Sequence, residues 1–135
     1  MILGVLGRID EQKSTLEEGI ACVESKTADG SLRRREAWSF MGDYLRERGE
    51  FAQAKTWYAR ARAGAEDTKD PATRVWVDAF RGEILWMERE TARAEGGVLE
   101  PALEAEFQSI VASFQKRDPG NPRLQRWADA GNPAH

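Results

Sequence analysis

The residue types that most often catalyse reactions or bind metals are scarce in this chain. Its 135 residues include one histidine, His135, and one cysteine, Cys22. Because the one histidine is the last residue, no internal Ser-His-Asp or Cys-His arrangement is expected, and a lone cysteine excludes an intrachain disulfide and a zinc cluster. No glycine-rich phosphate loop or nucleophile motif is present. The sequence therefore predicts a protein that is not an enzyme and that uses no metal and no cofactor.

Paired carboxylates are the remaining route to acid–base chemistry, and they are weakly indicated. Glu100, Glu104 and Glu106 follow the pair Gly96-Gly97. Glu100 and Glu104 share a helix face, but acidic residues near a helix start are explained by the helix dipole. Cys22 lies beside Val23 on an amphipathic segment, which favours a partly buried small residue over a reactive thiol.

The basic residues gather at Arg33-Arg34-Arg35, the one dense basic cluster. Glu36, Glu47 and Glu50 interrupt the arginines that follow, and the net charge of the chain is −3. A nucleic-acid surface needs an uninterrupted basic face, so no nucleic-acid partner is expected. Three arginines in the first turn of a helix also oppose its dipole. A solvated face is the favoured interpretation, and a phosphate-binding role stays open.

No segment reads as a membrane or targeting element. The apolar start, residues 1–7, has no basic residue ahead of it and is too short to span a bilayer. We therefore expect a cytoplasmic protein with no membrane partner. Arginine is much commoner than lysine, which is typical of GC-rich bacterial genomes.

Glycine and proline mark the helix boundaries. Asp70-Pro71 and Asn121-Pro122 each place a capping residue before a proline at the first helical position, and Gly49 and Gly96 are suited to helix ends. No segment alternates like a strand. We predict an all-α domain over residues 1–130 with a flexible tail over 131–135. The expected helices cover residues 9–25, 31–49, 50–63, 71–93, 99–116 and 122–128.

Internal similarity shows that the helices repeat. At an offset of 42 residues, Leu16 aligns with Tyr58, and at an offset of 40 residues, Gly42 aligns with Gly82. A recurring spacing of this kind is typical of stacked helical hairpins, which bury their apolar faces against neighbours.

The middle unit resembles a tetratricopeptide repeat. Trp38, Met41, Gly42 and Leu45 match that family's Trp-x-x-Leu-Gly-x-x-Tyr run, with methionine for leucine and leucine for tyrosine. The second helix adds the small-large-small series Ala54, Tyr58 and Ala61. The resemblance covers residues 1–117, most closely 35–63. It implies a right-handed stack of about three antiparallel helix hairpins, closed by a short C-terminal helix.

The resemblance also implies where a partner lies. In the family, first helices of successive units line a concave groove that binds proteins or peptides. We expect Trp76 and Trp86 to act as anchors, with the carboxylates of Asp43 and Glu83 selecting an amphipathic or basic segment. An alternative is that both tryptophans pack in the core. The full set carried over is Glu36, Ser39, Asp43, Arg46, Trp76, Ala79, Glu83 and Trp86.

The N-terminal segment carries a second candidate surface. Ile9, Leu16, Ile20 and Val23 recur at helical spacing, and a turn at Gly7 would precede their helix. The middle unit is not expected to cover the whole stripe. The main prediction is a protein-binding adaptor or scaffold module. Its alternatives are a structural unit that forms a homodimer through this stripe, and a regulatory domain that senses a small ligand in an enclosed pocket.

Overall fold

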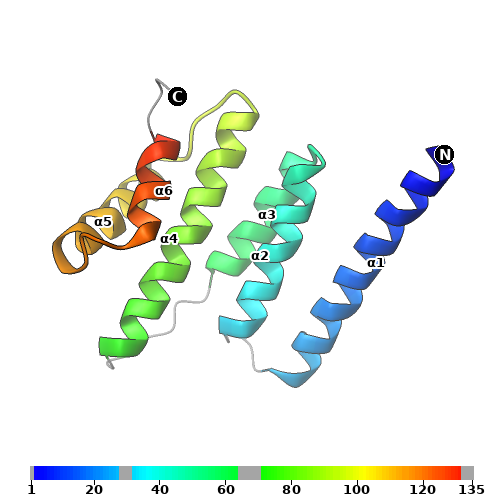
Figure 1. The fold of residues 1–135 in the computed structure, drawn as a ribbon, viewed down its shortest axis with the longest axis horizontal. Coiled ribbons are helices and arrows are strands. Elements are labelled where there is room, and N and C mark those ends of the chain that lie inside the picture. Colours follow the sequence, from blue (N-terminus) through cyan, green and yellow to red (C-terminus); the bar gives the residue numbers. More distant parts are fainter. Residues whose placement is uncertain (1, 28–31, 64–70, 132–135) are drawn as a thin grey trace. The chain divides into compact units, whose positions relative to one another are not determined.

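A computed structural model describes residues 2–27, 32–63 and 71–131 of the chain. All regular structure over these residues is helical, which confirms the all-α prediction (Figure 1). The helices are α1 (Ile2–Lys26), α2 (Leu32–Glu47), α3 (Phe51–Arg62), α4 (Pro71–Ala94), α5 (Pro101–Arg117) and α6 (Pro122–Gly131).

The chain divides into two compact units, Met1–Glu66 and Asp67–His135. The first contains α1, α2 and α3, and the second contains α4, α5 and α6. Each unit is described by itself below. The prediction of a single repeat domain over residues 1–130 stays a prediction, and all but Gly131 of the predicted tail lies outside the described residues.

Glycines end helices where their spacing predicts. Gly49 and Gly96 both adopt positive φ, 78° and 83°. After Gly96, the Gly97 amide donates to the Ala92 carbonyl at 2.9 Å, and the Glu50 amide donates to the Leu45 carbonyl at the same distance. Such bonds satisfy the last carbonyls of α4 and α2, and glycine allows the left-handed turn without a steric penalty.

Two predicted helix boundaries are wrong, both at chain ends. Helix α1 begins at Ile2 and continues through Gly7, where a turn was predicted. A single glycine costs a helix about 1 kcal/mol, which a long helix tolerates. Helix α6 runs to Gly131, beyond the predicted end at residue 128. The predicted caps Ser31 and Asp70 lie outside the described residues.

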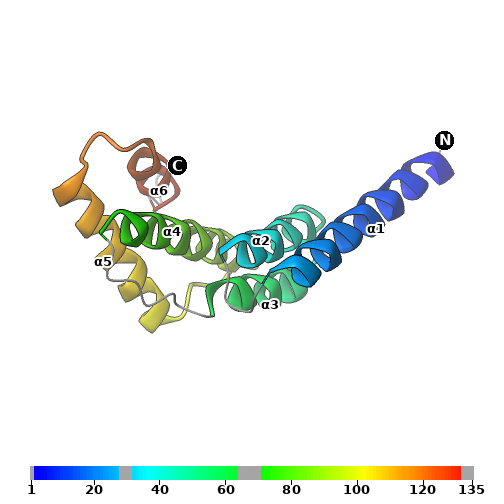
Figure 2. The same ribbon diagram turned by 90° about the horizontal axis from the view of Figure 1, so that it is seen from below.

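In the first unit, α2 packs tightly on α3 through a glycine. Trp38, Met41 and Leu45 of α2 are buried. A Cβ atom added to Gly42 would lie 2.6 Å from Cε1 of Tyr58, so the tyrosine ring occupies the space that a side chain would need. The glycine thus brings two antiparallel helices close together. Figure 1 shows α1 beside α2 and splaying away from it toward the N-terminus, as Figure 2 also shows.

The contact between Gly42 and Tyr58 predicts that alanine changes stability in opposite directions at two helical glycines, Gly42 and Gly19. Gly42→Ala forces the buried Tyr58 ring to move, and overpacking of this kind costs about 1–3 kcal/mol. Gly19 of α1 is exposed, and a Cβ there would meet nothing within 4 Å. Gly19→Ala should therefore raise the free energy of unfolding by about 0.5–1 kcal/mol through helix propensity. Urea denaturation of both variants checks the signs, and a stabilising Gly42→Ala would contradict the packing.

The second unit has its own core around Trp127 of α6. Phe107 and Phe114 of α5 meet the Trp127 ring edge-on, with centroids 5.7 and 5.8 Å away. A Cβ atom added to Gly82 of α4 would lie 2.7 Å from this indole. Ala79 and Leu85 of α4 complete the buried cluster. A glycine of α4 therefore receives an aromatic ring, as Gly42 does in α2.

Candidate functional site

An apolar groove of about 840 Å³ lies between α1 and α2 in the first unit. It is open to solvent, and most of its wall consists of aliphatic, aromatic and glycine residues. Phe40 forms part of the α2 wall with 52% of its surface exposed, in contrast to its buried neighbours Trp38 and Met41. The groove is lined by Glu11, Gln12, Thr15, Leu16, Gly19, Ile20, Val23, Arg33, Glu36, Ala37, Phe40 and Tyr44.

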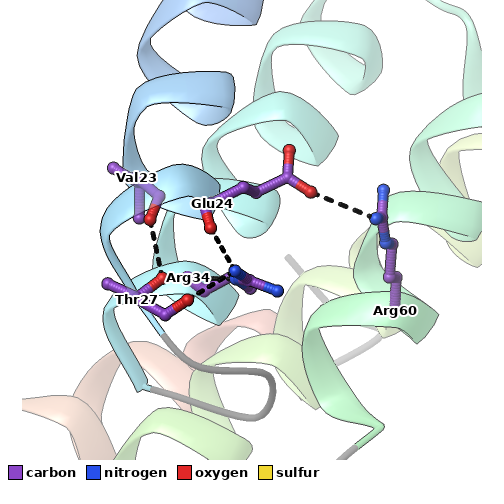
Figure 3. Close-up of polar contacts among 5 residues, drawn as sticks. All are labelled: Val23, Glu24, Thr27, Arg34 and Arg60. Carbon is purple, nitrogen blue, oxygen red and sulfur yellow. Dashed lines mark hydrogen bonds and ion pairs between the residues drawn. The ribbon is translucent and has the colours of Figure 1, made fainter.

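At one end of the groove, an arginine of α2 binds the last turn of α1 (Figure 3). Arg34 of α2 donates from Nη2 to the carbonyl of Thr27 at 2.6 Å and also to the carbonyl of Glu24. Glu24 in turn pairs with Arg60 of α3 at 3.4 Å. Carbonyls at a helix C-terminus have no partner within the helix, so a guanidinium there satisfies them and complements the dipole. The last turn of α1 is thereby fixed to α2 and α3.

The sequence predicts that the arginine cluster forms a solvated face, and this prediction is wrong for Arg34 and Arg35. Arg34 holds the end of α1, and Arg35 is buried with Nε donating to the Ala61 carbonyl of α3 at 2.6 Å. Only Arg33 is exposed. The C-termini of α1 and α3 lie beside the N-terminus of α2, and their carbonyls compensate arginines that would oppose the dipole of α2. Sequence alone does not show which helix ends meet.

Of the four first-unit residues carried over from the repeat family, Glu36 alone lines the groove. Ser39 is buried and donates from its hydroxyl to the Glu36 carbonyl at 2.6 Å. Asp43 accepts a hydrogen bond from the Tyr58 hydroxyl at 2.6 Å and lies 3.9 Å from Arg46. These two charges already have partners within the unit, so we do not include them in the candidate site.

The four second-unit residues carried over from the repeat family likewise differ in exposure and in contacts. Trp76 is 63% exposed, whereas Trp86 packs against the buried cluster of α4, α5 and α6, below the guanidinium of Arg126. Ala79 is buried in that cluster. Glu83 pairs with Arg126 and, at 3.5 Å, with Arg123 of α6. The core interpretation thus holds for Trp86, and the two tryptophans do not form one exposed floor.

The N-terminal stripe is partly covered. Ile20 is buried, while Leu16 and Val23 are half-buried and line the groove. Ile9 lies in α1, and its side chain is outside the described residues. The first unit thus covers Ile20 and leaves Leu16 and Val23 partly open, and the use of this stripe as an oligomer interface stays a prediction.

Sequence reasoning missed Phe40 and Tyr44. They follow Arg33, Glu36 and Ala37 at helical spacing, so the open stripe of α2 runs one residue beyond the expected Ser39 and Asp43. One residue corresponds to about 100° around a helix, which moves a side chain from the surface into the core. Phe40 reads as a core residue by type, and only its register relative to Trp38 and Met41 indicates the other face.

The hydrogen bond between the buried Tyr58 and the half-buried Asp43 gives the first unit a measurable pH dependence. Burial raises the pKa of Tyr58, and the hydrogen bond to Asp43 raises that pKa further. Burial likewise raises the pKa of Asp43, against the lowering effect of the Tyr58 hydroxyl. The folded state therefore keeps the tyrosine proton above pH ~10, where the unfolded chain releases it.

Tyr58→Phe tests this pair. At pH 7 the variant should lose about 1.5–3 kcal/mol, the contribution of a hydrogen bond to a charged group. Above pH ~10 the native protein loses stability because its unfolded state binds fewer protons, and the variant lacks this contribution. The gap between the two proteins should therefore narrow as the pH rises from 9 to 11 in urea titrations. A constant gap would contradict a raised tyrosine pKa.

Comparison with known proteins gives one short match. Residues 105–117, within α5, match the family model of the Syntaxin-5 N-terminal, Sly1p-binding domain. Thirteen residues do not assign the chain to that family, and two of them, Phe107 and Phe114, are buried in the second-unit core. No curated protein and no solved structure matches the chain. No helix among the described residues is long and apolar enough to cross a membrane.

Proposed function

We propose that the chain is a non-catalytic protein-binding module of tetratricopeptide type, and that its partner lies in the groove between α1 and α2. The observation that carries this proposal is the exposure of Phe40 within an apolar wall open to solvent. An exposed aromatic in a groove is the usual anchor point of a protein interface, because it supplies much apolar area at low entropic cost.

The fold supports a repeat-type stack without depending on the comparisons. Gly42 accepts Tyr58 between α2 and α3, and Gly82, forty residues later, accepts Trp127. Two glycines forty residues apart thus each receive an aromatic ring, from α3 in the first unit and from α6 in the second, in line with the internal repeat of the sequence. The family model that matches residues 105–117 is named for binding a protein, but two of the matched residues, Phe107 and Phe114, are buried in the core of the second unit.

The two alternatives are less well supported. A small-ligand sensor calls for an enclosed pocket, and the groove is open to solvent. A homodimer through the N-terminal stripe calls for an exposed stripe, and Ile20 at its centre is buried. The sedimentation experiment described below can detect the homodimer.

Selection of binding peptides from a random display library tests the proposal. Peptides enriched on the native chain should bind Phe40→Glu at least about tenfold more weakly, because a buried charge at the anchor position is unfavourable. Trp76→Glu is the matched control, since it places the same charge at an exposed aromatic of the second unit and should leave binding unchanged. Enriched peptides that bind both variants as well as the native chain would overturn the proposal.

A further inference from the structure

The occupant of the groove can be specified further, on the assumption that the proposed function is correct. We infer that it is an amphipathic helix of a partner protein, which packs on α1 as α2 packs on α3. This helix presents apolar side chains with the spacing of Trp38, Met41 and Leu45, and it carries an acidic first turn and a basic last turn.

The internal repeat supplies the first argument. At the offset of 42 residues, Gln12, Leu16 and Gly19 of α1 correspond to Ala54, Tyr58 and Ala61 of α3. The three α3 residues are fully buried, and α2 packs beside them. The three α1 residues all line the open groove. In α3 this face is covered by α2. The corresponding face of α1 is open.

The size of the side chains supplies the second argument. Gly42 is needed in α2 because the ring of Tyr58 lies where a Cβ would be. Leucine stands at the corresponding position 16 of α1, and Gly19 has free space around its missing Cβ. A helix lying on α1 thus needs no glycine, and alanine suits the position that corresponds to Gly42. Because Gly19 has no side chain that would hold a neighbour away, the backbone of a helix can come close to α1 at this point.

Charge complementarity supplies the third argument. A helix that lies on α1 as α2 lies on α3 runs antiparallel to α1, from the Val23 end of the groove to the Glu11 end. Arg33 lies at the first of these ends, with Glu36 one turn further along α2, and Glu11 lies at the second. An acidic first turn then faces Arg33, and a basic last turn faces Glu11. This distribution also suits the partner helix's own dipole.

A synthetic helix tests the inference on the full chain. The probe is a fluorescent 16-residue peptide, the length of α2. It has tryptophan, methionine and leucine at the spacing of 38, 41 and 45, alanine at the place of Gly42, glutamates in the first turn and lysines in the last. A hydrocarbon staple on the opposite face holds it helical. The control peptide exchanges the glutamates and lysines.

The expected result is saturable binding by fluorescence anisotropy, weaker for the charge-exchanged peptide. Gly19→Leu is the decisive variant, because it fills the groove while replacing a helical glycine by a better helix former. Its folding is therefore preserved, and we expect at least about tenfold weaker binding. Equal binding to Gly19→Leu, equal binding of the two peptides, or no binding of the probe would overturn the inference.

Two further results separate this inference from the proposed function. If display-selected peptides lose binding to Gly19→Leu while the designed helix does not bind, the inference fails and the proposed function stands. If neither the display-selected peptides nor the designed helix binds Gly19→Leu more weakly than the native chain, the proposed function fails as well. A dimer in sedimentation velocity that Gly19→Leu dissociates would show that a second copy fills the groove, which also overturns the inference.

Discussion

Replacing Trp127 by alanine is expected to lower the free energy of unfolding of the second unit by about 3–5 kcal/mol, the usual cost of truncating a buried tryptophan. The indole is 1% exposed and meets Phe107 and Phe114 edge-on. It also fills the space above Gly82, so its loss leaves a cavity between three helices. Helix α6 has ten residues, too few to be stable alone in water.

Amide hydrogen exchange is the appropriate measurement for Trp127→Ala, because the chain has two compact units and need not unfold in one step. Exchange should accelerate through α6 and α5. Trp76→Ala is the matched control, because this tryptophan of the same unit is 63% exposed and its loss should change stability by less than about 0.5 kcal/mol. Equal effects of the two variants would contradict the assignment of Trp127 to the core.

Arg35→Ala is expected to destabilise the first unit by a similar amount, about 3–5 kcal/mol. The side chain is 1% exposed, and Nε donates to the Ala61 carbonyl at the end of α3. Truncation removes a large buried side chain, at about 2–5 kcal/mol, and leaves that carbonyl without its donor, at about 1–3 kcal/mol. The truncation cost and the lost-donor cost do not add in full, because neighbouring side chains move into the vacated space.

Two variants separate the contributions at position 35. Arg35→Met restores most of the volume but not the donor, so about 1–3 kcal/mol of the loss should remain. Arg33→Ala, two residues earlier on the exposed face, should change stability by less than about 0.5 kcal/mol, because it only removes a positive charge from a helix N-terminus. Exchange in α2 and α3 reports both, and a neutral Arg35→Ala would contradict the helix-end contact.

The helices were predictable because their boundaries are local. Gly49 and Gly96 adopt the left-handed conformation that few other residues tolerate, and Pro71 and Pro122 begin helices as their missing amides allow. The errors fall where local signals are weak. Gly7 resembles a helix stop, but the helix continues through it, since one glycine costs little in a long helix.

The candidate site was only partly predictable because it depends on which helix faces meet. Leu16 and Val23 were identified because helical spacing places them on an amphipathic face, and Glu36 was identified through the tetratricopeptide resemblance. Phe40 was missed, because whether α2 turns it toward α3 or away depends on packing. The roles of Arg34 and Arg35 depend on the ends of α1 and α3, two helices other than their own.

The groove between α1 and α2 is the central claim, and Gly19→Leu tests it most directly. The measurement is the dissociation constant of display-selected peptides for the native chain and for this variant. We expect at least about tenfold weaker binding to Gly19→Leu, with a thermal midpoint no lower than that of the native chain. Unchanged affinity in the folded variant would contradict the claim, since a leucine at position 19 lies in the middle of the proposed site.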